Sequence, residues 1–202
     1  MITQDHIARG MSYAQYSKLL NDLMAQGKTT GGNQSDDYVN YAKLNVQRMH
    51  RLDKTMELIP ELKEALAKVN EHYVWLVLTE GWCGDAAQNL PIIHAMEKEC
   101  PNIELVLLLR DENLDVMDQY LTGSSRSIPK VICLEKDTAT HSLKEIFVWG
   151  PRPDAAQDMM LELKNTNVPH DEMVLAVQKW YNNDKTLSAQ NEFVALVKRL
   201  HR

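Results

Sequence analysis

The stretch that most constrains how this chain can fold runs from Thr79 to Pro91, with the sequence T-E-G-W-C-G-D-A-A-Q-N-L-P. It follows a segment rich in β-branched and aromatic residues, Tyr73 to Leu78, and it opens a helical pattern that ends near Cys100. A buried strand is therefore predicted to lead through a glycine turn into a helix, with Cys83 at the helix start. The N-terminus of a helix leaves backbone N–H groups unpaired and carries a partial positive charge, and both favour a thiolate over a thiol.

The tripeptide Trp82-Cys83-Gly84 resembles the start of the thioredoxin active site, which continues with Pro-Cys. Here it continues with Asp85-Ala86, so the second sulfur of that motif is missing. Pro91 lies eight residues after Cys83, the offset at which thioredoxins carry the proline that kinks the active-site helix. Thioredoxins also bury an acidic residue six positions before the reactive cysteine, and here that position is Val77. The chain therefore resembles a thioredoxin-superfamily protein with a single active-site thiol, over residues 60–165.

A second part of the resemblance comes from Ile128-Pro129, which precedes a strand-like segment, Val131 to Leu134. Thioredoxins have an Ile-Pro at about this distance from the cysteine, with the proline in the cis form beside the reactive sulfur. The resemblance implies a cis Pro129 and an Ile128 backbone beside Cys83, where an extended substrate segment could pair with it. Arg126 also has a counterpart in many thioredoxins. The residues implied to support Cys83 are Trp82, Gly84, Asp85, Arg126, Ile128 and Pro129.

The alternation of strands and helices predicts an α/β fold. Strand 73–79, helix 83–99 and strand 103–109 form a βαβ unit, so these two strands should be parallel. The elements expected after them are a helical segment near 113–120, strand 130–135, a turn at 136–141, strand 144–149 and helix 154–165. The resemblance implies a thioredoxin-like three-layer sandwich with a mixed four-stranded sheet, two parallel strands plus an antiparallel hairpin. Its implied spatial order is strand 103, strand 73, strand 130, strand 144.

Both ends of the chain are expected to add helices to this core. Residues 1–58 offer no candidate for the further N-terminal strand of thioredoxins. Amphipathic patterns predict helices at 11–26, 34–56, 56–69, 170–183 and 187–201. We expect an N-terminal helical extension (1–58), a thioredoxin-like core (59–166) and a C-terminal helical extension (167–202), together in one compact domain. The apolar stripes of the last two helices are expected to pack against the N-terminal helices rather than form a groove for a partner.

Charge, hydropathy and cysteine content limit the classes of function that the chain can have. A net charge of −6, spread along 202 residues, argues against nucleic-acid binding. The sequence has no apolar run long enough to span a membrane and no secretory pattern at Met1 to Gly10. Three cysteines do not make a disulfide scaffold, and the odd number fits a reducing compartment. We expect a cytoplasmic protein without a cofactor, and the scattered histidines predict no metal site.

Cys83 is expected to act without a second thiol. Cys100 should lie about 25 Å away at the far end of the helix. Cys133 should lie about 13 Å beyond Pro129 along a central strand. A disulfide needs Cα atoms within about 7 Å, so neither residue is placed to resolve a bond at Cys83.

Charged neighbours push the Cys83 pKa in both directions. Asp85 and Glu80 would raise it, whereas the helix N-terminus would lower it, as would Arg126 if its side chain points toward the sulfur. On balance we expect a Cys83 thiol more acidic than that of free cysteine. Two roles stay open for Asp85: favourable first-turn helix chemistry, or contact with a substrate or partner.

Three function classes remain open from the sequence. In the first, Cys83 carries out monothiol thiol–disulfide exchange on protein or low-molecular-weight thiol and disulfide substrates, in cell redox homeostasis, and an external thiol releases it. In the second, the thioredoxin fold is a non-catalytic binding or redox-sensing module. In the third, the thiol is a relic in an interaction or structural protein. The first is favoured, because the fold alone does not require a cysteine at this position, and dithiol reduction of insulin is expected to be absent.

Overall fold

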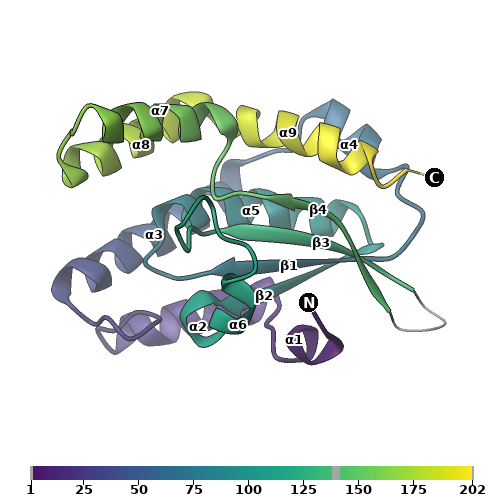
Figure 1. Ribbon diagram of the computed structural model, residues 1–202, viewed down its shortest axis with the longest axis horizontal. Coiled ribbons are helices and arrows are strands. Elements are labelled where there is room, and N and C mark those ends of the chain that lie inside the picture. Colours follow the sequence, from purple (N-terminus) through teal and green to yellow (C-terminus); the bar gives the residue numbers. More distant parts are fainter. Residues whose placement is uncertain (1, 138–141, 202) are drawn as a thin grey trace.

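The computed structural model describes residues 2–137 and 142–201 and is built around one four-stranded sheet (Figure 1). The strands are β1 (Tyr73–Thr79), β2 (Ile103–Leu109), β3 (Lys130–Lys136) and β4 (Leu143–Trp149), in the order β2-β1-β3-β4. β1 is parallel to β2, and β3 is antiparallel to both β1 and β4. The predicted α/β class, strand order and strand directions are confirmed. The predicted turn at 136–141 falls largely on residues 138–141, outside the described residues.

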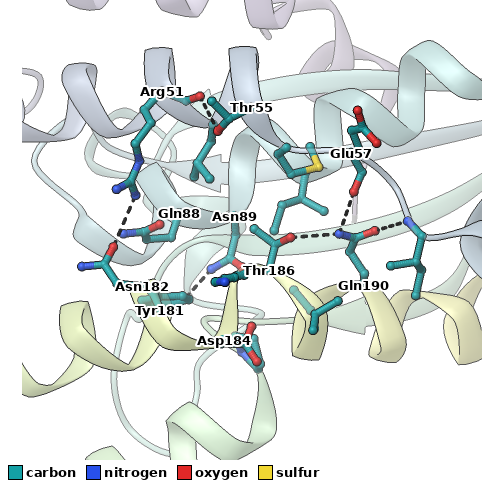
Figure 2. Close-up of a pocket in the computed structure, with 18 residues that line it drawn as sticks. Arg51, Thr55, Glu57, Gln88, Asn89, Tyr181, Asn182, Asp184, Thr186 and Gln190 are labelled. Atoms are coloured by element: carbon teal, nitrogen blue, oxygen red, sulfur yellow. Dashed lines mark hydrogen bonds between the residues drawn. The ribbon is translucent and has the colours of Figure 1, made fainter.

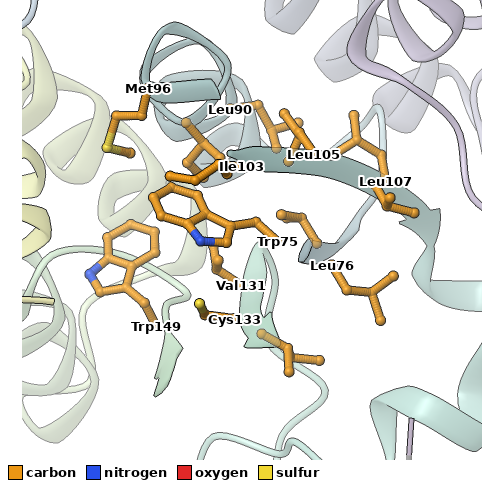
Figure 3. Packing of buried hydrophobic residues seen from close by; sticks show 14 of the residues in the cluster. Trp75, Leu76, Leu90, Met96, Ile103, Leu105, Leu107, Val131, Cys133 and Trp149 are labelled. Atoms are coloured by element: carbon orange, nitrogen blue, oxygen red, sulfur yellow. The ribbon is translucent and has the colours of Figure 1, made fainter. Parts of the chain in front are cut away.

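The central strand β1 is buried along its whole length. Its run of apolar residues is typical of a strand covered on both faces. Trp75 is fully buried, pairs with Leu105 and Cys133 on the neighbouring strands, and stacks on Phe193 with ring centroids 5.5 Å apart. Figure 3 shows this tryptophan among apolar side chains of the sheet and of the helix that follows β1. The core therefore holds the end of β1, where Cys83 begins the next helix.

Most helices agree with the sequence pattern. Before the sheet lie α1 (Gln4–Ala8), α2 (Tyr13–Ala25), α3 (Asp36–Thr55) and α4 (Pro60–Leu66). Within and after it lie α5 (Gly84–Glu99), the 3-10 helix η1 (Arg110–Glu112), α6 (Leu114–Met117), α7 (Asp154–Asn165), α8 (His170–Asp184) and α9 (Leu187–Lys198).

Two helix predictions need correction, and one helix was missed. The short helix α1 was not predicted. The expected helix at 56–69 begins only at Pro60, because a proline fits the first turn of a helix and restricts the residue before it to extended conformations. The segment near 113–120 is helical only over Leu114–Met117, with η1 before it.

The terminal helices share one hydrophobic core with the sheet. Tyr16 and Leu20 of α2 and Phe193 and Val197 of α9 belong to the same buried cluster as β1. α9 packs on α4, whereas α8 contacts α7 and reaches α5 through side-chain hydrogen bonds. α8 also meets the N-terminal helix α3, because Arg51 Nη2 donates to Asn182 Oδ1 at 3.4 Å, so the expected packing of the last two helices on the N-terminal helices is seen for α9 and in part for α8. The division of the chain at residues 58 and 166 stays a prediction.

The outer edge of β2 is covered by the chain itself. Met11 forms a single antiparallel bridge there, with its N–H 2.9 Å from the Leu107 carbonyl oxygen and its carbonyl oxygen 2.8 Å from the Leu107 nitrogen. Gly10 permits this approach, because an added Cβ would lie 2.1 Å from Val106 Cγ1. The Leu105 N–H donates to the Glu97 carboxylate at 3.0 Å. The single bridge of Met11 therefore covers part of the β2 edge, in an N-terminal region where the sequence predicted no further strand.

Candidate active site

Cys83 lies where the chain leaves β1 and enters α5. It is the N-cap of α5, and its Sγ accepts a hydrogen bond from the Ala86 N–H at 3.4 Å. The thiol donates to the Ile128 carbonyl oxygen, 3.2 Å from Sγ, and the Ile128–Pro129 bond is cis. The expected cis proline and the expected position of the Ile128 backbone beside Cys83 are confirmed. Only 8% of the Cys83 surface is exposed, so the sulfur is nearly enclosed.

Burial reverses the predicted acidity of Cys83. Desolvation is the largest cause that raises the pKa of the thiol to about 12, and the negative charge of Asp85 adds to it. The backbone N–H groups of Ala86 and Asp85 and the charge of Arg152 lower the pKa, but by less. The expectation of a thiol more acidic than free cysteine is therefore wrong for this conformation. The helix start acts in the predicted direction and is outweighed by the removal of water.

The cation that lowers the pKa of Cys83 is Arg152 rather than Arg126. The Arg126 guanidinium is bound to Asp118, with Nε 2.6 Å from Oδ1 and Nη2 2.9 Å from Oδ2. Arg152 instead binds Asp85 with two hydrogen bonds, from Nε to Oδ1 at 3.1 Å and from Nη2 to Oδ2 at 2.6 Å. Both side chains of this pair are largely buried. No spacing in the sequence links Arg152 to Cys83, and only the flanking prolines Pro151 and Pro153 mark its segment as a defined turn.

A tyrosine of α8 completes the environment of Asp85. The Tyr181 hydroxyl donates to Asp85 Oδ1 at 2.8 Å and accepts from Asn89 Nδ2 at 3.0 Å. Asn89 Nδ2 also donates to the Asp85 carbonyl oxygen at 2.8 Å. Figure 2 shows Asn89 and Tyr181 facing each other at one side of a cavity of about 350 Å³ between α3, α5, α8 and α9. Asp85 is therefore fixed by the chain itself, a role beyond the two that the sequence left open.

The remaining predicted residues, Trp82 and Gly84, lie against side chains that are far from them in the sequence. The Trp82 ring lies 5.2 Å from the ring of Tyr38 on α3, and the Arg110 guanidinium lies 4.8 Å above it. A Cβ added at Gly84 would lie 2.8 Å from the Gln178 amide nitrogen of α8. A side chain at position 84 would therefore meet α8 and require the flexible Gln178 side chain to move.

The carboxyl group of Glu80 points into the protein interior rather than toward the Cys83 thiol. It accepts hydrogen bonds from the Thr30 hydroxyl and, at 2.9 Å, from the Asp111 N–H. Only 1% of Glu80 is exposed, and burial raises the pKa of this carboxyl. Glu80 therefore ties the turn before Cys83 to the N-terminal segment.

The other two cysteines do not form a pair with Cys83. All three are free and buried. Cys100 caps the far end of α5, whose 16 residues span about 24 Å. Cys133 lies on β3 opposite Trp75. Among residues 2–137 and 142–201, no group of three or more His, Cys, Asp or Glu side chains is arranged to hold a metal ion, and no helix is long and apolar enough to cross a membrane.

A strand that ends at a helix-capping cysteine, facing a cis proline at the start of the neighbouring strand, defines a protein of the thioredoxin fold. The chain belongs to the thioredoxin family, because the family model described as thioredoxin matches residues 31–173. Two solved structures share its fold over 98% of both chains. One is the 1.5 Å crystal structure of a protein of unknown function, PA1234 from Pseudomonas aeruginosa, with 20% identity and a TM-score of 0.62. The other is an HIV epitope scaffold with 18% identity and a TM-score of 0.61. No curated protein matches the sequence.

The raised pKa of Cys83 predicts slow alkylation. At pH 8 a pKa near 12 in place of 9.0 leaves about a thousandfold less thiolate, partly offset by the greater nucleophilicity of a more basic thiolate. We expect iodoacetamide to modify Cys83 about 30-fold more slowly than a free thiol of ordinary pKa.

The variant Asp85→Asn should shift the alkylation profile to lower pH, because it removes a negative charge and leaves Arg152 unpaired. Peptide mass spectrometry over a pH series measures both effects. Asp118→Asn, which also frees an arginine, is the control, and equal profiles for the two variants would contradict the role of Asp85.

Proposed function

We propose that the protein carries out thiol–disulfide exchange through Cys83 alone. The observation that carries this proposal is the position of Cys83 Sγ, 3.4 Å from the Ala86 nitrogen and 3.2 Å from the Ile128 carbonyl oxygen, in a chain of the thioredoxin family. Ala86 occupies the position of the second cysteine of a dithiol motif. The Cys83 thiolate attacks one sulfur of a disulfide, forms a mixed disulfide and releases the other half as a thiolate. A second, external thiol then attacks the mixed disulfide and restores Cys83.

The substrates are protein or low-molecular-weight disulfides, and the protein acts in the cytoplasm. Three free cysteines in the described chain support a reducing compartment. The buried thiol supports a reaction that begins when a substrate or a local movement lets Cys83 lose its proton.

A second candidate is a binding or redox-sensing module, and the raised pKa of Cys83 favours it. A thiol that stays protonated at neutral pH is a weak nucleophile, and its hydrogen bond to Ile128 stabilises that protonated form. In this function the surface around Pro129 would hold a partner segment, and Cys83 would contribute packing rather than chemistry.

Intact-protein mass after incubation with small symmetric disulfides separates the two functions. For exchange we expect one adduct of half the disulfide on the native protein, located on Cys83, removed by an added thiol and absent from Cys83→Ser. Because the protein has no second thiol near Cys83, reduction of insulin with a thioredoxin reductase system should stay at background. An adduct that forms only after denaturation in urea would favour the binding module, and rapid insulin reduction would contradict the monothiol mechanism.

A further inference from the structure

A second cavity lies near the cis proline, and Ser127, two residues before Pro129, is part of its lining. Its volume is about 450 Å³, and it is formed between the segment 122–127, Arg152 and the helices α7 and α8. Figure 1 shows α7 and α8 together beyond the end of the sheet where β1 stops. The polar lining residues are Thr122, Ser124, Ser125, Ser127, Arg152, Gln157, Lys164 and His170.

The lining of this cavity contains no carboxylate. Its charged or chargeable groups are Arg152, Lys164 and His170, and four hydroxyl groups add hydrogen-bond donors. This composition is opposite to that of the whole chain, in which 28 acidic residues outnumber 22 basic ones. Asp85 and Asp171 pair with Arg152 and His170, but neither aspartate lines the cavity. Lys164 forms no ion pair within the described ranges, so its charge is available to an occupant.

A buried lysine beneath the cavity strengthens the same electrostatic pattern. Lys130 is 5% exposed, and its ammonium donates to Thr122 Oγ1 at 2.7 Å and to the Gly150 carbonyl oxygen at 3.0 Å. Both partners are neutral, and no carboxylate pairs with Lys130 in the part of the chain that the structure describes. Thr122 lines the cavity, so Lys130 lies directly behind its wall. A positive charge held by neutral acceptors attracts an anion placed on the other side of that wall.

Two lining residues connect the cavity with the surroundings of the reactive sulfur. Ser127 lines the cavity and precedes Ile128, whose carbonyl oxygen accepts the hydrogen bond of the Cys83 thiol. Arg152 lines it from the other side while it holds Asp85, two residues after Cys83. A group bound in the cavity therefore contacts the two segments that carry the hydrogen-bond partners of Cys83 and Asp85.

We propose that this cavity binds the carboxylate end of a small anionic disulfide, and that it selects such molecules as the exchange substrate of Cys83; this inference rests on the proposed exchange function. Ammonium, guanidinium and hydroxyl donors around a cavity of about 450 Å³ match a carboxylate on a short carbon chain. In the step itself, the Cys83 thiolate attacks one sulfur of the diacid disulfide. The bond to the carboxylate-bearing half forms, the original S–S bond breaks, and the other half leaves as a thiolate with its own carboxylate.

Three symmetric disulfides of similar length and different charge test this selection. They are 3,3′-dithiodipropionate with two negative charges, 2-hydroxyethyl disulfide with none, and cystamine with two positive charges. The rate of the Cys83 adduct is measured by intact mass at pH 8 and divided by the rate of the same disulfide with 2-mercaptoethanol, which carries no charge besides its thiolate. We expect the corrected rate to be about tenfold higher for the diacid than for the neutral disulfide and lowest for cystamine, with the advantage reduced at high salt.

The variant Lys164→Gln should lower the diacid rate at least about threefold and leave the neutral rate unchanged. Lys179→Gln is the matched control. It also removes one positive charge, but from a residue of α8 that lies outside the cavity lining. Equal corrected rates for the three disulfides, or equal effects of the two lysine variants, would overturn this inference while exchange itself stands. Absence of adducts from all three would overturn the proposed exchange function. In that case calorimetry still tests the cavity: binding of the diacid is measured on Cys83→Ser and on the double variant Cys83→Ser with Lys164→Gln. The absence of binding to Cys83→Ser would refute the proposal for the cavity.

Discussion

Replacing Gly150 by alanine is expected to destabilise the protein by about 3–5 kcal/mol, from backbone strain and overpacking together. Gly150 has φ +106°, a conformation that L side chains rarely adopt, and an added Cβ would lie 2.3 Å from the Pro129 carbonyl oxygen. That oxygen belongs to a backbone that cannot rotate away, as a side chain could. The same substitution should displace Pro129 and with it the acceptor of the Cys83 thiol, so the Cys83 alkylation profile should also change.

Urea unfolding followed by tryptophan fluorescence measures this loss. Gly123→Ala is the control, because Gly123 also has a positive φ, +59°, but nothing lies within 4 Å of an added Cβ. It should cost about 1 kcal/mol, the usual penalty for a left-handed conformation without a clash. If the two variants lost equal stability, the close approach of Gly150 to Pro129 would not be a constraint on the fold.

Replacing Arg152 by methionine is expected to cost about 3 kcal/mol of folding free energy, at the lower end of the range for a broken buried ion pair. The change leaves the Asp85 carboxylate buried with Tyr181 as its neutral partner, and side-chain exposure of only 12% gives it little access to water. Removing both charges, in Asp85→Asn with Arg152→Met, should recover part of this loss, because no unpaired charge remains.

Chemical unfolding of the two single variants and the double variant gives the coupling energy between Asp85 and Arg152. Arg126→Met is the comparison, because Arg126 makes the same two-hydrogen-bond contact with Asp118 at the exposed surface. Its loss should change stability little, since solvent screens exposed ion pairs. Additive losses at Asp85 and Arg152 would show that the pair does not hold α5 to the segment after β4.

Local sequence signals predicted the part of the site that lies within one continuous stretch. The apolar run Tyr73–Thr79, rich in β-branched and aromatic residues, favours a strand covered on both faces, and the glycine turn after it places Cys83 at the start of α5. Ile128-Pro129 was placed by resemblance, and its cis bond beside Cys83 is confirmed. These features depend on neighbouring residues or on a motif with a fixed spacing, and the sequence contains both.

The electrostatics of the site could not be predicted, because it depends on segments that meet only in the folded chain. Arg152 and Tyr181 reach Asp85 from the end of β4 and from α8. Neither residue has a spacing that marks it. The acidity of Cys83 was predicted from the helix start and from charges close to it in the sequence, and the burial that reverses it comes from the packed fold around the helix start. The position of Arg126 was carried over by resemblance, but here Asp118 takes its guanidinium.

The covered edge of β2 has a consequence for how copies of the protein meet at high concentration. Exposed strand edges recruit strands from other molecules and begin aggregation. Along β2, the N–H of Ile103 bonds Cys100, that of Leu105 bonds Glu97 and that of Leu107 bonds Met11. The carbonyl oxygen of Leu109 accepts from Asn113 at 2.8 Å. A second chain approaching this border of the sheet finds these groups already occupied, so β2 offers only an interrupted template for strand addition.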